Sequence, residues 1–193
     1  AAYKTGKSSS ANRFETANSD LVDMGDLDCA GNRYVLNTVM LASRYGMANG
    51  MAKKTSAITA KTFTKQRLRV EAKTAVSRKD PSYRVEVMRH DPGPEFDGAT
   101  RDALGEAKII NSKGETDLHQ HNSVVENRNQ RIQNAASAMA QTAMGDNIEL
   151  YSPMVGCAAL CWATECVNHT MITAEHKEKG QTAHKAQFWN EET

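Results

Sequence analysis

Residues 87–96 read VMRHDPGPEF, an apolar start that leads directly into an acidic turn. The residues just before this stretch alternate between apolar and polar side chains, which predicts a strand over residues 83–88. Asp91 then precedes a Pro-Gly pair, a composition typical of a turn. The sequence therefore predicts a strand that ends at an acidic turn, and Asp91 taken alone is most simply the residue that opens this turn.

The clearest helix is predicted over residues 123–143, downstream of that turn. Apolar side chains recur there at helical spacing, at Val125, Ile132, Ala136, Met139 and Ala143. Glu126 lies on this helix, three residues after Ser123. Because this is also the spacing of a capping box, Glu126 taken alone has a simpler interpretation as part of the helix N-terminus.

The remaining elements predict a sheet that forms from the first half of the chain and is covered by helices. Residues 20–48 contain short apolar runs separated by turns, typical of a hairpin followed by a third strand. Helices are expected over residues 54–73 and 153–170, a weaker one over 100–108, and a polar loop over 111–122. This order favours an α/β fold of the ribonuclease H-like type, a mixed sheet with helices on both faces.

Length and composition favour one domain with polar ends. The chain has 193 residues, enough for a sizeable core. Residues 1–19 predict an extended N-terminal arm, residues 20–175 the domain, and residues 176–193 a polar C-terminal tail. No stretch approaches the roughly 18 consecutive apolar residues of a membrane span, so we expect no membrane insertion and an intracellular location.

The four cysteines are expected to be buried and reduced. Three of them, Cys157, Cys161 and Cys166, lie in one apolar segment with helical character, and no paired CxxC motif is present. We therefore expect neither a disulfide framework nor a zinc site.

The net charge of +1 conceals a basic stretch over residues 53–79, where Glu71 is the only acidic residue. Such a stretch favours binding of a polyanion. The alternative is a solvated helix face whose counter-charges come from elsewhere in the fold.

Two segments resemble motifs of copia-type retrotransposon integrases. Residues 87–96 are similar to the strand-end motif R-x-D-N-G-x-E-F, and residues 120–132, QHNSVVENRNQRI, are similar to Q-Q-N-G-V-V-E-R-x-N-R-x-I. Between Asp91 and Glu126 stand 34 residues, one fewer than the spacing that names the D,D-35-E superfamily. Weaker similarities lie in GNRYVL at 31–36, LASRY at 41–45 and CWATECVN at 161–168.

The resemblance implies a polynucleotidyl transferase that acts on DNA ends. In this family, two Mg²⁺ or Mn²⁺ ions are held by an Asp on the first strand, an Asp after a later strand and a Glu on a helix. Asp91 and Glu126 match the second and third positions. Four residues compete for the first position, and we take Asp23 first and Asp26 second; the others are Asp20 and Asp28.

The resemblance also implies DNA as the partner, a homo-oligomer or a larger protein assembly, and a nuclear location for an active integrase. The expected DNA contacts come from the basic stretch and from the surroundings of the helix that carries Glu126. They are Lys53, Lys54, Lys61, Lys65, Arg67, Arg69, Lys113, Asn122 and Gln130.

Two departures from the motifs leave other functions open. Pro92 stands where the family has Asn, and Ser123 stands where it has Gly. Neither change removes a carboxylate. The first alternative is a non-catalytic, integrase-derived protein reused as a structural subunit of a larger assembly. The second is a DNA-binding module that keeps the basic stretch without the metal site.

Overall fold

A five-stranded mixed sheet forms the centre of the computed structural model, which describes residues 16–113, 123–145, 148–170 and 180–188. The strands lie in the order β3-β2-β1-β4-β5, and the first three form an antiparallel meander, to which β4 and β5 add in parallel. Their bounds are β1 Thr16–Asp23, β2 Tyr34–Met40, β3 Gly46–Met51, β4 Val87–His90 and β5 Ile110–Lys113.

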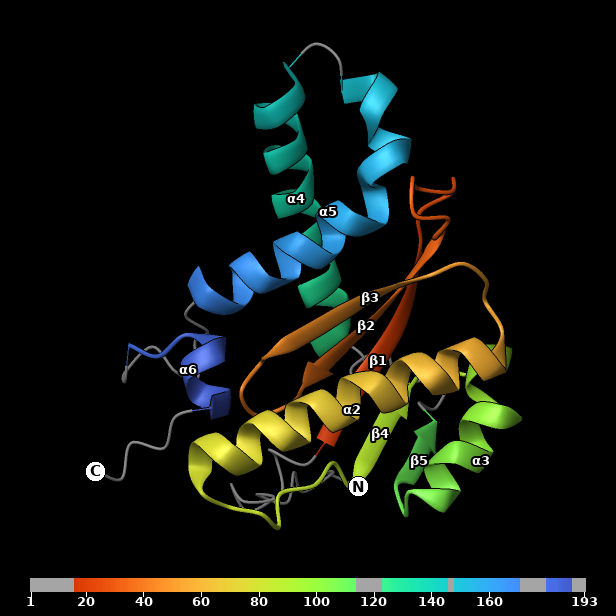
Figure 1. Ribbon diagram of the computed structural model, residues 1–193, viewed down its shortest axis with the longest axis vertical. Coiled ribbons are helices and arrows are strands. Elements are labelled where there is room, and N and C mark those ends of the chain that lie inside the picture. Colours follow the sequence, from red (N-terminus) through yellow and green to blue (C-terminus); the bar gives the residue numbers. More distant parts are fainter. Residues whose placement is uncertain (1–15, 114–122, 146–147, 171–179, 189–193) are drawn as a thin grey trace, which may run out of the picture.

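Helices cover both faces of this sheet, as the sequence predicts. The long helix α2 runs along one face, with α3 near one of its ends and α6 near the other, while α4 and α5 lie on the opposite face (Figure 1). Their bounds are α2 Ser56–Arg78, α3 Ala99–Glu106, α4 Ser123–Met144, α5 Ile148–Thr170 and α6 Ala183–Phe188; a short 3₁₀ helix, η1, spans Pro94–Phe96. None of the helices in the described ranges is long and apolar enough to cross a membrane.

Each face of the sheet has its own hydrophobic core. On the α2 face, Leu36 and Met40 of β2 pack with Phe63 of α2 and with neighbouring apolar residues. On the other face, Val35 packs with Ile132 of α4 and with apolar residues of α5. The two cores hold the sheet between its helical layers and thereby fix which face each strand residue points to.

The strand β1 begins at Thr16, inside the segment predicted as an arm. Its first four residues are buried although most are polar, because their side chains find partners inside the fold. The hydroxyl groups of Ser19 and Thr38 are hydrogen-bonded at 2.9 Å, and Thr38 donates to Gln66 of α2 at 2.7 Å. An apolar pattern did not reveal the start of this strand, since Ala17 is the only apolar side chain among its first four residues.

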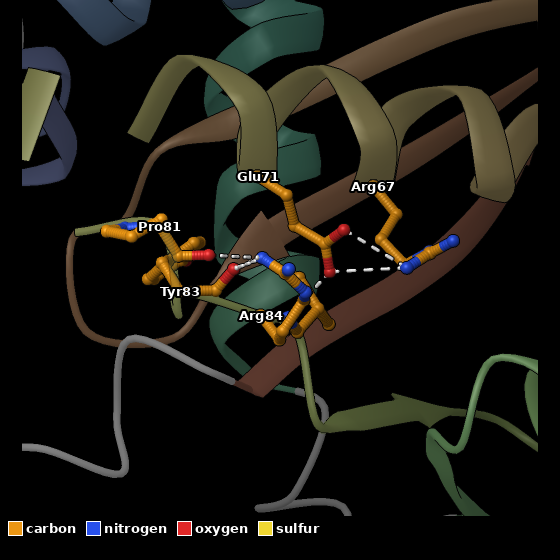
Figure 2. A network of polar contacts seen from close by, with 6 residues as sticks. Arg67, Glu71, Pro81, Tyr83 and Arg84 are labelled. Atoms are coloured by element: carbon orange, nitrogen blue, oxygen red, sulfur yellow. Dashed lines mark hydrogen bonds and ion pairs between the residues drawn. The ribbon is translucent and has the colours of Figure 1, made fainter. Parts of the chain in front are cut away.

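The strand predicted over 83–88 is displaced, and Figure 2 shows why. The backbone N–H of Val85 donates to the carboxylate of Glu71 on α2 at 2.9 Å instead of pairing with a strand. Glu71 is buried, and Arg67 donates to it at 3.0 Å. This attachment of the chain to α2 places β4, and with it the acidic turn that follows.

Two further segments differ from the sequence prediction. Residues 111–113, expected in a polar loop, belong to the edge strand β5, which begins at the exposed Ile110. Residues 183–188, expected in a polar tail, form α6, which packs against α2 and α5. The buried Gln187 of α6 donates to Thr74 at 3.0 Å, and Arg78 of α2 donates to the Ala186 carbonyl at 2.7 Å. Hydrogen bonds to distant residues again explain the difference.

We expect the docking of α6 to weaken in acid because of His184. Burial, together with the nearby charges of Lys73 and His169, lowers the pKa of His184 to about 4. Because the folded-state pKa lies below the ordinary 6.5, protonation favours the unfolded chain, so stability is lost as the pH falls from about 6.5 toward 4. In urea titrations, His184→Gln should lose less stability between neutral pH and pH 5 than the wild-type chain. Equal losses in the two proteins would contradict this assignment.

Candidate active site

The parallel pairing of β1 with β4 brings two acidic residues together. Ser19 of β1 lies opposite His90 of β4. The residues that follow in the chain are Asp20 and Asp91. Burial raises the pKa of Asp20 most, and Asp91 lies near enough for its charge to raise this pKa further. Asp20 points to the α4 face, because its carboxylate accepts a hydrogen bond from Asn129 of α4 at 2.6 Å.

The helix α4 adds a third carboxylate and a buried amide. Glu126 lies one turn before Asn129, hence on the same side of α4. Asn129 is itself held by Asn37, the β2 residue paired with Asp20, whose amide donates to the Asn129 side-chain oxygen. Asn37 and Asn129 thus orient Asp20 through two buried side chains.

The pKa of Asp20 reports a concentration of negative charge. Burial raises this pKa most, the Leu21 backbone N–H lowers it, and the charges of Asp91, Glu126 and Glu95 raise it further. Like charges held close together favour either a bound proton or a bound cation. The site is therefore suited to a positively charged ligand.

Asp23, taken first from the sequence, lies elsewhere. It is exposed at the end of β1, where Arg33 donates to it at 2.9 and 3.1 Å and lowers its pKa. Asp26 is also exposed, and Asp28 accepts from the backbone N–H groups of its own turn, including Ala30 at 2.9 Å. The structure therefore brings Asp20, and not Asp23, beside Asp91.

The carboxylates fit a hard divalent cation by their chemistry, because Mg²⁺ and Mn²⁺ prefer oxygen ligands. In the described part of the chain, however, no three His, Cys, Asp or Glu side chains lie close enough together to hold one ion. The carboxylate oxygens are thus suitable ligands for such a cation, but the structure does not hold them in a preformed metal site. Asp91 and Glu126 are both exposed, so packing restricts their side chains less than that of the half-buried Asp20.

A buried histidine supports Asp91. One ring nitrogen of His90 lies 2.7 Å from the Asp91 carbonyl oxygen, and the other lies 2.5 Å from the side-chain oxygen of Asn111 on β5. The ring also stacks on Phe96 with centroids 4.4 Å apart. No role in this site was predicted from the sequence for His90, Asn37, Asn111 or Asn129. Only Asn129 carried a local signal, its spacing from Glu126.

The predicted DNA contacts divide into two groups. Exposed members are Lys53, Lys54, Lys61, Lys65, Arg69 and Gln130. Of the other predicted contacts, Arg67 is held by Glu71, and Lys113 is exposed but pairs with Asp97 at 2.6 Å. Asn122 lies outside the described residues. Within the exposed group, Lys54 pairs with Glu95 at 3.2 Å and Arg69 with Glu165 at 3.8 Å. Part of the basic stretch is therefore neutralised within the fold.

The cysteines are unpaired, and they do not all share one environment. Burial raises the pKa of Cys157 to about 12, which makes its thiol a poor nucleophile and ligand. Cys29, expected to be buried, is exposed in the turn between β1 and β2. Cys29 lies in a polar turn, and the carboxylate of Asp28 accepts hydrogen bonds from the backbone of that turn.

Strand order, the antiparallel meander and the helices on both faces define a ribonuclease H-like α/β fold, which confirms the predicted fold class. Among solved structures, the chain is similar to the catalytic core domain of BIV integrase, with a TM-score of 0.57 and 15% sequence identity, over 89% of this chain and 92% of that one. No protein-family model and no curated protein matches the sequence. The fold is thus that of an integrase catalytic core, while the copia-type origin stays a prediction from the motifs.

Proposed function

We propose that this chain is a polynucleotidyl transferase of the integrase type that acts on DNA ends. The observation that carries the proposal is that Asp20 lies on the strand paired with the one that leads into Asp91, and that Asp91 and Glu126 lie near enough for their charges to add to burial in raising the pKa of Asp20. A shared fold alone supports many chemistries, so the proposal depends on the site. Three acidic side chains from distant elements are what a two-metal phosphoryl transfer requires.

In this proposal Asp20 takes the first acidic position, in place of Asp23. Two Mg²⁺ or Mn²⁺ ions, once bound, would activate the attacking oxygen and stabilise the leaving one. The protein's part is to hold the carboxylates: Asn129 orients Asp20, and His90 holds the turn at Asp91. No histidine or cysteine needs to act as the nucleophile, because water or a DNA 3′-hydroxyl serves.

The exposed lysines support DNA as the partner, because a phosphate backbone binds largely through such charges. Lys53 and Lys54 stand just before α2, on the side of the sheet where Asp23 and Glu95 lie. Exposed apolar side chains, among them Trp162, Leu68 and Val76, favour self-association or a larger assembly. A copia-type origin and a nuclear location belong to the same proposal.

A second candidate is a non-catalytic subunit that descends from such an enzyme. It is favoured by the absence, among the described residues, of three metal-ligating side chains within reach of one ion. Pro92 in the acidic turn, where the resembled motif has Asn, favours it as well.

Calorimetric titration of Mn²⁺ separates the two candidates. We expect the wild-type chain to bind Mn²⁺, and Asp91→Asn and Glu126→Gln to lose this binding while remaining folded by circular dichroism. An oligonucleotide strand-transfer assay would then follow. If the folded wild-type chain neither binds Mn²⁺ nor joins DNA in its presence, the proposal fails and the structural subunit is the better conclusion.

A further inference from the structure

A fourth carboxylate stands beside the acidic site without belonging to the predicted set. Glu95 of η1 is 5% exposed, and its Oε1 atom lies 3.2 Å from the ammonium nitrogen of Lys54. Its Oε2 atom is buried, with no hydrogen-bond partner in the part of the chain that the structure describes. A buried carboxylate with one oxygen unpaired is costly for a fold, so this arrangement calls for an explanation.

The Glu95 carboxylate is held in one place by the acidic turn. A Cβ atom added at Gly93 would lie 2.6 Å from Oε1 and 2.7 Å from Oε2, so a residue with a side chain at this position would displace the carboxylate. The Thr100 hydroxyl donates to the Glu95 carbonyl at 2.7 Å and to the Ser56 carbonyl at 2.9 Å. Glu95 is thereby fixed between the turn that contains Asp91 and the first residue of α2.

Lys54, the partner of Glu95 in the ion pair, lies just before the N-terminus of α2. It precedes Thr55, the N-cap residue, and the first turn of α2 carries no acidic side chain. The charge of Lys54 lowers the pKa of Asp23, and that of Glu95 raises the pKa of Asp20. Because the Glu95 carboxylate also lies against Gly93 of the acidic turn, the ion pair lies at the rim of the acidic site.

The ion pair is better suited to binding than to stability. The Lys54 side chain is 44% exposed, and pairs of this kind usually contribute little to folding. An ammonium has three donors, of which Glu95 takes one, so the others remain for a ligand on the exposed side. The neighbouring carboxylates repel a phosphate, and a fixed positive charge beside them reduces that repulsion.

We infer that Glu95 is a positioning residue that holds the Lys54 ammonium at the rim of the acidic site, where Lys54 contacts a backbone phosphate of bound DNA. This inference rests on the proposed function for the identity of the ligand. It adds a specific phosphate contact and the residue that fixes it. Glu95 itself touches neither DNA nor metal in this arrangement.

A double-mutant cycle on DNA binding tests the inference. Fluorescence anisotropy with a short labelled duplex, in EDTA and over a salt series, would compare the wild-type chain with Lys54→Ala, Glu95→Gln and the double variant. We expect Lys54→Ala to weaken binding about tenfold and to reduce the salt slope by about 1. Glu95→Gln should have a similar effect, and adding Lys54→Ala to it should change little. Lys54→Arg should retain the slope, and Lys185→Ala, an exposed lysine of α6, should leave binding unchanged.

The opposite pattern would overturn the inference. If Lys54→Ala weakens DNA binding equally in the wild-type chain and in the Glu95→Gln variant, or if Glu95→Gln strengthens binding, then Glu95 only neutralises Lys54. Thermal unfolding of each variant shows that a loss of binding is not a loss of fold. A wild-type chain that binds DNA but joins none in Mn²⁺ contradicts the proposed function alone. An active chain in which the effects of the two substitutions on DNA binding are additive contradicts this inference alone. A chain that binds no DNA contradicts both.

Discussion

Asp20→Asn should reduce metal-dependent DNA joining by at least about a hundredfold, the loss typical when one catalytic group is removed. Asp23→Asn should stay within about twofold of the wild-type chain, because Asp23 is occupied by Arg33 in an exposed ion pair. The two residues lie three positions apart on one strand, so the pair of variants is a matched comparison.

The measurement is strand transfer of an oligonucleotide with a free 3′-hydroxyl in Mn²⁺, with the unfolding midpoint of each variant as the control. Asp20→Asn should remain folded, although its amide can accept only one of the two hydrogen bonds that the carboxylate accepts from the Leu21 N–H and from Asn129. The pKa of Asp20 is raised in the folded state, so its ionised form opposes folding at neutral pH, and a neutral amide removes this effect. A loss of joining in Asp23→Asn together with an active Asp20→Asn would return the first acidic position to Asp23.

Asn168→Ala should destabilise the fold by about 3–5 kcal/mol, because it leaves several buried polar groups without partners. The Asn168 amide acts as a neighbouring strand for the edge of β3: its oxygen accepts from the Gly46 N–H, and its nitrogen donates to the Gly46 carbonyl, both at 2.8 Å. Arg128 donates to the same oxygen at 2.5 Å. Asn168 is fully buried and Arg128 nearly so.

The loss of stability in Asn168→Ala is expected to be large because of Arg128. Burial lowers its pKa to about 10, and its Nε and Nη1 atoms have no hydrogen-bond partner among the described residues. Without Asn168 the buried guanidinium would lose the hydrogen bond that Asn168 accepts, and the charge of Glu165 compensates that of the guanidinium only in part. Adding Arg128→Met to Asn168→Ala should recover part of the stability. Urea unfolding measures both, and Gln130→Ala on the exposed side of α4 is the control; a cost below about 1 kcal/mol for Asn168→Ala would contradict this account.

The sequence predicted those parts of the fold whose cores are apolar. The stripe from Val125 to Ala143 predicted α4 within a residue or so of its bounds, and the apolar runs of the first fifty residues predicted the antiparallel strands. The start of β1 and the strand β5 were missed, because Ser19 is buried through a hydroxyl contact and Ile110 is exposed. A local sequence pattern predicts burial from apolar side chains, but in these two segments a polar side chain is buried and an apolar one is exposed.

The candidate site shows the same limit. Asp91 and Glu126 could be proposed from motifs, since each lies in a locally recognisable segment. The choice of Asp20 over Asp23 depends on which β1 residue stands beside the end of β4, and that pairing joins residues about seventy positions apart. Asn37 and Glu95 depend on such distant contacts as well, so no short pattern could have indicated them.

The register of β1 also makes the site sensitive to chain length. Side chains on a strand alternate between faces, so one residue inserted between Thr16 and Asp20 would turn the carboxylate away from Asn129. Asp20 would then take the place of Leu21, which packs against the apolar core on the α2 face. Substitutions along this strand alter one contact at a time, whereas a single insertion or deletion would remove the carboxylate from the site while every element around it remained.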